Sequence, residues 1–444
     1  MSNCRGSRQK GQALAQALET FVTPVLVKLD VRLDSRLVRT FLVTLQAMVV
    51  LRHSAYGLLL SELGGYITSP VQAPAGTKRL SNLLHSSRWG SWFISKFLWE
   101  QATDFIEEQG RQEQVALVVW DESVVEKPES SHLEGLCAVR SSSAARLKRI
   151  KPGFYNPPGG RPVFVPGMQW LTLVVVGMTG YPRLAAMQWW TTRGKFALRP
   201  QPTPVQMLQR SAYFWQRQVI HVWDRGFASR AWLAQAFRFQ VRFILRWKYK
   251  QHLVDGHGKR AAWQMVRGKR SLHHRLIWDA RRHCWRKTGL YWLPVTHPDF
   301  PHHPLFLVVS RPGHGLKPWY LLTNELIHTH EDAWRIIFAY ARRWQIEMTY
   351  RFAKTELALE SPRLWSWHHR LKLMMMVSLV YAFLLSLLET RFEVLTTWLL
   401  RHWCHRTGQH LRDVALPLYR LRAALARLWL SHPPSFSFAW KNSG

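Results

Sequence analysis

Acidic residues are scarce in this chain of 444 residues. It has 27 Asp and Glu residues against 61 Lys and Arg, so its formal charge is +34. A surplus of this size makes a protein repel itself and attract polyanions. We therefore consider nucleic acid first as a partner and an anionic membrane second. Hydrophobic residues make up 47% and charged residues 20% of the chain, which excludes a disordered or collagen-like protein.

Cysteine is scarcer still, and no apolar run is long enough to span a bilayer. The four cysteines form no Cys-x-x-Cys pair, which favours a reducing compartment over a disulfide-stapled secreted scaffold. The longest apolar stretch, Leu373–Leu388, falls short of the ~20 residues that span a bilayer, so it predicts a buried helix and no membrane partner. The first residues are polar and basic, so we expect no signal peptide and a cytoplasmic protein.

The pattern of the chain changes near Gln114. Before it, long apolar-periodic runs predict helices with basic edges, which suit DNA binding but also fit an ordinary amphipathic bundle. After it, buried strands such as Val219–Trp223 alternate with helices, which is typical of an α/β core. We predict five regions: a helical DNA-binding region (1–110), the first part of the core (111–245), a basic β-rich insertion (246–310), the second part of the core (311–390) and a basic helical C-terminal region (391–444).

Two phrases of the sequence match each other. Val119-Trp120-Asp121 and Val222-Trp223-Asp224 each place a carboxylate directly after a buried strand. Ligands of α/β sheets bind at such strand ends, and adjacent strands would bring both carboxylates together. Carboxylates hold hard cations such as Mg²⁺. The alternative is that each Asp is only a turn or cap residue. A third phrase, Ile277-Trp278-Asp279, lies in the basic insertion, and we interpret its Asp as a hairpin residue.

A third acid lies on a helix predicted from Asp332 to about Leu357. At ~100° per residue, several of its polar residues fall on one stripe about 60° wide. One interpretation is a salt-bridge ladder along the helix. The other is that Glu347 binds a metal ion while the neighbouring Arg and Lys side chains bind a phosphate. The stripe consists of Tyr340, Arg343, Glu347 and Lys354, with Arg351 on the same side.

These residues resemble a known family. The order Tyr340-x₂-Arg343-x₃-Glu347-x₆-Lys354 is similar to the signature of the DDE transposases of bacterial insertion sequences, in particular the insertion-sequence-4-like group. Asp121-Glu122-Ser123 and Asp224-Arg225-Gly226-Phe227 resemble the two aspartate motifs of that group. The resemblance covers about residues 110–390, and the long gap before Glu347 is similar to the β-rich insertion of the group.

The resemblance implies an α/β fold with an RNase H-like core, in which a mixed five-stranded sheet is flanked by helices. It implies that Asp121, Asp224 and Glu347 form a catalytic triad that binds two Mg²⁺ ions, for which Mn²⁺ can substitute. Tyr340, Arg343, Lys354 and Arg351 would contact DNA. The implied function is metal-dependent cleavage of element ends followed by strand transfer. The implied partners are double-stranded transposon ends and target DNA, bound by a homodimer in the DNA complex. The implied location is the bacterial cytoplasm, at the nucleoid when the protein is bound to DNA. An RNase H-like nuclease or resolvase, or a non-catalytic DNA-binding relic of a transposase, remains the alternative.

Overall fold

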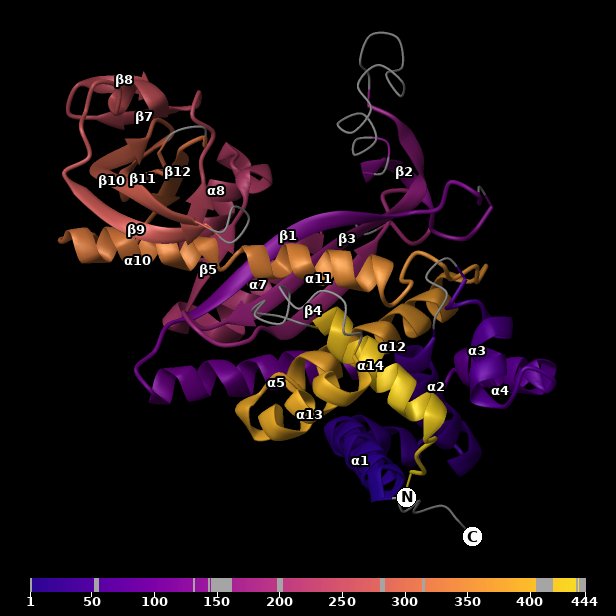
Figure 1. Ribbon diagram of the computed structural model, residues 1–444. Coiled ribbons are helices and arrows are strands. Elements are labelled where there is room, and N and C mark those ends of the chain that lie inside the picture. The colour runs from indigo at the N-terminus through magenta and orange to yellow at the C-terminus, as the bar shows by residue number, and fades with distance from the viewer. Residues whose placement is uncertain are drawn as a thin grey trace.

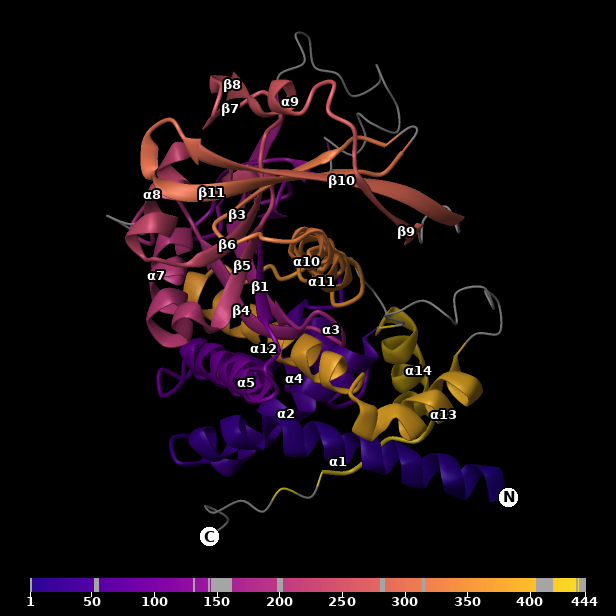
Figure 2. The same ribbon diagram turned by 90° about the vertical axis from the view of Figure 1, so that its left-hand side faces the viewer.

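The computed structural model describes residues 2–51, 56–130, 132–142, 144, 162–197, 203–279, 284–313, 316–404, 418–436 and 438. Over these ranges the chain forms a mixed α/β structure in which helices flank one large mixed sheet (Figures 1 and 2). The expected α/β class is therefore confirmed. The basic segment 145–161, which contributes to the charge of the chain, lies outside the described residues.

The helices and strands have the following bounds. The helices are α1 (Ser2–Asp30), α2 (Ser35–Val50), α3 (Leu60–Ile67), α4 (Ala73–His85), α5 (Trp92–Arg111), α7 (Thr203–Trp215), α8 (Arg230–Arg238), α9 (Ala262–Met265), α10 (His330–Ala341), α11 (Trp344–Thr355), α12 (Trp367–Ser386), α13 (Glu393–Trp403) and α14 (Leu418–Ser431), with short 3-10 helices η2 (Gln216–Gln218), η3 (Arg225–Phe227) and η4 (Thr390–Phe392). The strands are β1 (Ala116–Glu126), β2 (Cys137–Arg140), β3 (Phe164–Val176), β4 (Arg183–Trp190), β5 (Val219–Trp223), β6 (Arg242–Arg246), β7 (His252–Asp255), β8 (Gly258–Ala261), β9 (His273–Asp279), β10 (Cys284–His297), β11 (Phe300–Arg311) and β12 (Trp319–Thr323).

Five strands form the part of the sheet that carries the predicted aspartates. Their order is β4-β3-β1-β5-β6, in which β1, β3 and β4 are antiparallel neighbours whereas β5 and β6 run parallel to β1. The sheet does not stop at five strands as expected. β12 pairs antiparallel with β6, and β11, β10, β7 and β8 continue the order. The free edge of β6 offers unpaired backbone groups, and β12 satisfies them.

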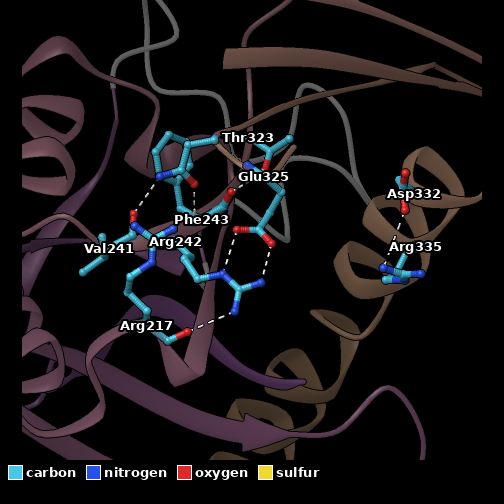
Figure 3. Close-up of polar contacts among 9 residues, drawn as sticks. Arg217, Val241, Arg242, Phe243, Thr323, Glu325, Asp332 and Arg335 are labelled. Carbon is cyan, nitrogen blue, oxygen red and sulfur yellow. Dashed lines mark hydrogen bonds and ion pairs between the residues drawn. The ribbon is translucent and has the colours of Figure 1, made fainter. Parts of the chain in front are cut away.

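Polar side chains strengthen the junction between β6 and β12 (Figure 3). The guanidinium of Arg242 donates to both carboxylate oxygens of Glu325, at 2.9 and 2.5 Å. The hydroxyl of Thr323 donates to the carbonyl of Phe243 at 2.6 Å. These contacts join β12 to β6, and β11 pairs with the other edge of β12. Strands β7 to β10 and most of β11 fall in region 246–310, and the boundaries of the five regions stay predictions.

Alternate residues of each central strand enter two different cores. Leu117 and Val119 of β1 pack with α10, α11 and α12, whereas Val118 and Trp120 pack with α5, α7 and α8. This alternation follows from the period of two in a strand. Asp121 therefore belongs to the face of the sheet on which α10 and α11 lie, end to end, in Figure 1.

The helices of the two terminal regions pack into one layer around α12. By length and composition α12 could cross a membrane, but 89% of its apolar window is buried inside the protein, so the predicted buried helix is confirmed. α14 contacts α1, α2 and α12. The indole of Trp429 in α14 donates to the carbonyl of Gly11 in α1 at 3.1 Å. Residues from both ends of the sequence thus share one core.

Two predicted elements need correction. The first strand continues past Asp121 to Glu126, because β3 pairs with it residue by residue up to Glu126. The single helix expected over 332–357 is two helices, α10 and α11, interrupted at Arg342 and Arg343. There the backbone bonds tighten to the 3-10 spacing, as in the bond from the N–H of Arg343 to the carbonyl of Tyr340 at 3.0 Å.

Candidate active site

The two matching phrases lie side by side. In the parallel ladder between β1 and β5, Val119 is the partner of Val222 and Trp120 is the partner of Trp223. β5 ends at Trp223, so one predicted aspartate follows at once, and the other is the next residue of β1. Strand register alone therefore brings Asp121 and Asp224 to the same point, as the sequence predicts.

Tryptophans hold the two strand ends in place from the opposite face. Trp120 and Trp223 are fully buried, and their ring centroids are 6.4 Å apart. The indole N–H of Trp120 donates to Nδ1 of His221 at 2.9 Å. Burial lowers the pKa of His221 to about 3, so this imidazole is neutral and can accept the bond. Large buried rings beneath the acids favour one fixed arrangement of both strands.

Asp224 is also a cap, as the alternative interpretation predicts. Its Oδ1 accepts the N–H of Gly226 at 2.7 Å at the start of η3. A Cβ at Gly226 would lie 2.8 Å from that oxygen, so a larger residue would crowd the carboxylate. Capping explains the local turn, and it engages one of the two oxygens of Asp224.

Asp121 carries the clearest electrostatic signal of the site. Its pKa is raised from 3.8 to about 7; burial is the largest cause and the negative charge of Asp224 the next. Arg343 and the N–H of Glu122 lower the pKa but do not compensate. The charge of Glu347 raises it slightly. The charges of the other two predicted acids, Asp224 and Glu347, therefore both act on Asp121.

Arg343 lies between two of these acids. Its guanidinium binds the carboxylate of Glu347 one turn later in the helix, and its Nη1 is 3.8 Å from Oδ2 of Asp121. The side chain of Arg343 is 14% exposed, so solvent screens these pairs less than on an open surface. The salt-bridge interpretation of the stripe is thus present for Glu347, in a bridge that also reaches β1.

The other predicted DNA-contacting residues occupy different environments. Tyr340 is buried, with its ring edge-on to Trp319 at 5.1 Å. Lys354 donates to the carbonyl of Val124 at 2.6 Å and pairs with Glu360 at 3.0 Å. Arg351 is exposed to solvent. Their DNA contacts stay predictions, and a contact by Tyr340 would require that its side chain becomes exposed.

The donor set suits a divalent ion, although the arrangement is not a closed cage. Within the described residues, no three His, Cys, Asp or Glu side chains are grouped so that they could hold one metal ion. At the candidate site, Glu347 is paired with Arg343. The two aspartates nevertheless repel each other in a partly buried place, which is the condition that a bound cation relieves.

Sequence reasoning missed two residues of this site. Tyr350 of α11 donates its hydroxyl to the backbone carbonyl of Asp121. Its spacing of three residues from Glu347 places it on the same helix face and could have pointed to it. Glu122 follows Asp121, and both burial and the charge of Asp224 raise its pKa. It adds negative charge beside the two aspartates.

Comparison with known proteins gives little. No protein-family model and no curated protein matches the chain. One similar solved structure is a cryo-EM structure of a piggyBac transposase synaptic complex with hairpin DNA. The two chains are 12% identical with a TM-score of 0.32, over 71% of this chain and 54% of that one. The match thus spans about half of that transposase, and a similarity this low does not assign a function.

Proposed function

We propose that the protein is a DDE transposase that cleaves the ends of a DNA element and joins them to target DNA. The observation that carries the proposal is the convergence of Asp121, Asp224 and Glu347. Two of them come from the parallel neighbours β1 and β5, and the third comes from α11, which lies against β1. The four-position signature in the sequence supports the same assignment.

The arrangement of strands supports an RNase H-like core as the finer description of the fold. Such a core requires a mixed five-stranded sheet with helices on both faces. The order β4-β3-β1-β5-β6 provides the strands, and the two cores on either side of β1 provide the helical layers. In this description β7 to β11 form the insertion before the glutamate helix.

The proposed reaction is phosphodiester chemistry. Two Mg²⁺ ions, or Mn²⁺ in their place, held by Asp121, Asp224 and Glu347, would supply the charge that activates an attacking oxygen and stabilises the leaving oxygen. Asp121 would lose its proton on binding a cation. In the first step water attacks a phosphorus at the element end and a DNA 3′-hydroxyl is released. In the second step this hydroxyl attacks a target phosphodiester, which releases another 3′-hydroxyl.

Arg343, directly before α11, and Arg351, within α11, are the cations that could bind DNA phosphates at this site. Arg343 pairs with Glu347 and lies 3.8 Å from the carboxylate of Asp121 in the DNA-free protein. Once other cations balance these acids, its planar guanidinium can bind a phosphate in bidentate fashion. Arg351 is already exposed on the same helix. Joining two ends requires two such sites, so we propose that the DNA complex is a homodimer.

The test uses DNA duplexes that cover the sequences flanking the gene, incubated with Mg²⁺ or Mn²⁺. We expect the wild type to cut at the element ends, and Asp121→Asn, Asp224→Asn and Glu347→Gln to cut roughly 100-fold more slowly or worse, because each loses several kcal/mol of charge stabilisation. Asp104→Asn, which changes an exposed acid on α5, serves as the control and should cut normally.

DNA binding, measured by anisotropy, should be nearly the same in all variants. If each triad variant cuts as fast as the wild type, the site assignment is wrong. A wild type that binds DNA and never cuts it would indicate a transposase relic. Cutting without preference for the element ends, or preference for a branched junction, would indicate a nuclease or resolvase.

A further inference from the structure

Helix α11 is bonded to the backbone of β1 where β5 has already ended. Ladder pairing between β1 and β5 stops at Trp120, while β1 continues to Glu126. Beyond that point two side chains of α11 donate to carbonyls of β1. The hydroxyl of Tyr350 binds the carbonyl of Asp121, and Nζ of Lys354 binds the carbonyl of Val124 at 2.6 Å.

Tyr350 is buried at the interface between α11 and the sheet. It is 7% exposed, and its ring meets that of Trp170 edge-on at 4.5 Å. Its hydroxyl lies beside Thr172, the cross-strand partner of Asp121 in β3. A backbone carbonyl can only accept, so the hydroxyl of Tyr350 is the donor in its bond to Asp121. The bond therefore joins α11 to the β1–β3 pair at a single fixed point.

The position of this bond on α11 matters for the acids. Glu347, Tyr350 and Lys354 are spaced by three and four residues, so they lie on one face of the helix. Tyr350 binds the residue that carries one of the acids and lies one turn from the other acid. Sliding or rotating α11 would break this bond and change the separation of the Asp121 and Glu347 carboxylates together.

We infer that Tyr350 is a positioning residue, whose hydroxyl holds α11 in register with β1 and so sets the separation of the Asp121 and Glu347 carboxylates. The inference rests on the proposed function, because it takes these carboxylates as a pair that must hold divalent ions. Removing the hydroxyl should loosen the pair without removing either acid. Contacts that orient metal ligands typically change metal affinity by about 10- to 100-fold.

The test compares Tyr350→Phe with Tyr381→Phe. Both keep a buried ring and lose one hydroxyl. Tyr381 of α12 is hydrogen-bonded to Thr349 of α11 at 2.8 Å, so the control also loosens α11 but leaves its bonds to β1 intact. Binding of Mn²⁺ to the full chain without DNA is measured by electron paramagnetic resonance. The Mn²⁺ dependence of end cleavage and the melting temperature are measured in parallel.

We expect Tyr350→Phe to bind Mn²⁺ about tenfold more weakly and to need about tenfold more Mn²⁺ for half-maximal cleavage. Tyr381→Phe should show a similar loss of melting temperature with wild-type affinity for Mn²⁺. The inference is overturned if Tyr350→Phe binds Mn²⁺ like the wild type, if both variants weaken binding equally, or if the wild type binds no Mn²⁺. A wild type that binds Mn²⁺ without cutting DNA rejects the proposed function only, since the binding comparison still decides the role of Tyr350.

Discussion

Asp121 is a carboxyl group whose charged form the folded protein disfavours. Its pKa is about 7 in the folded chain against an ordinary value of 3.8, chiefly because of burial and then because of Asp224. Between these pH values the folded state keeps a proton that the unfolded state has released. The free energy of unfolding therefore falls as pH rises from about 4 to about 7. Above pH 7 Asp121 is charged in both states, and the loss in free energy of unfolding has reached its full size.

Replacing Asp121 by Asn should stabilise the metal-free protein at pH 8 and have little effect at pH 4. Asparagine keeps an oxygen that can accept the N–H of Glu122 and removes the repulsion with Asp224. The expected gain at pH 8 is on the order of a few kcal/mol, since one pKa unit corresponds to about 1.4 kcal/mol. Urea unfolding at both pH values measures it. Equal stability of variant and wild type at pH 8 would contradict the raised pKa.

For single residues, the sequence predicts the positions of the acids better than the residues that contact them. Asp121 and Asp224 follow matching apolar strands, so their proximity could be predicted from strand alternation alone. Tyr350 could not be assigned in this way, because its role depends on how far α11 lies from β1 after β5 ends. The bridge from Arg343 to Asp121 joins residues more than two hundred positions apart, and no local pattern indicates it.

Among the structural elements, the central helix α12 binds the end of a helix from the N-terminal region. Lys372 of α12 is 6% exposed and donates from Nζ to the carbonyls of Leu84 at 2.8 Å and Ser86 at 2.7 Å, at the C-terminal end of α4. The last carbonyls of a helix lack intrahelical partners and carry partial negative charge. The buried ammonium group of Lys372 donates hydrogen bonds to these carbonyls and balances their partial negative charge. It thereby fixes α4 to α12.

Lys372→Met should therefore destabilise the protein by about 1–3 kcal/mol, because it keeps the length of the side chain but leaves two carbonyls without this donor. Lys96→Met is the matched control. Lys96 lies on α5, is 58% exposed and pairs with Glu100 at 3.6 Å, so its loss should cost less than about 0.5 kcal/mol. The two unfolding free energies are compared in urea. Similar losses in both variants would show that the buried hydrogen bonds of Lys372 stabilise the fold no more than an exposed ion pair does.

Elements with strong apolar patterns could be predicted closely from the sequence. The strand predicted at Val219–Trp223 matches β5 residue for residue. The extension of β1 was missed because polar residues follow Asp121, and β3 rather than hydrophobicity holds them in the sheet. The break at Arg342 and Arg343 was missed because neither residue is a glycine or proline, and both keep helical backbone angles.

For the whole molecule, the sequence could not show that one sheet runs through the insertion. This depends on the pairing of Leu321 in β12 with Arg246 in β6, and neither strand carries a mark of its partner. The joining of the two terminal regions around α12 is of the same kind. The net charge of the whole molecule, in contrast, follows from composition alone, because it does not depend on how the strands and helices pair.

A net charge of +34 predicts that DNA binding weakens steeply with salt. Each phosphate that a cation neutralises contributes about −0.9 to the slope of log K against log salt concentration. With about six or more such contacts, affinity for a duplex should fall by roughly 1,000-fold between 50 and 200 mM KCl. Anisotropy titrations measure this. Asp121→Asn should leave the slope unchanged, whereas Arg351→Gln should reduce it by about one if Arg351 contacts a phosphate. A slope near zero would show that the positive charge of this protein does not serve to bind DNA.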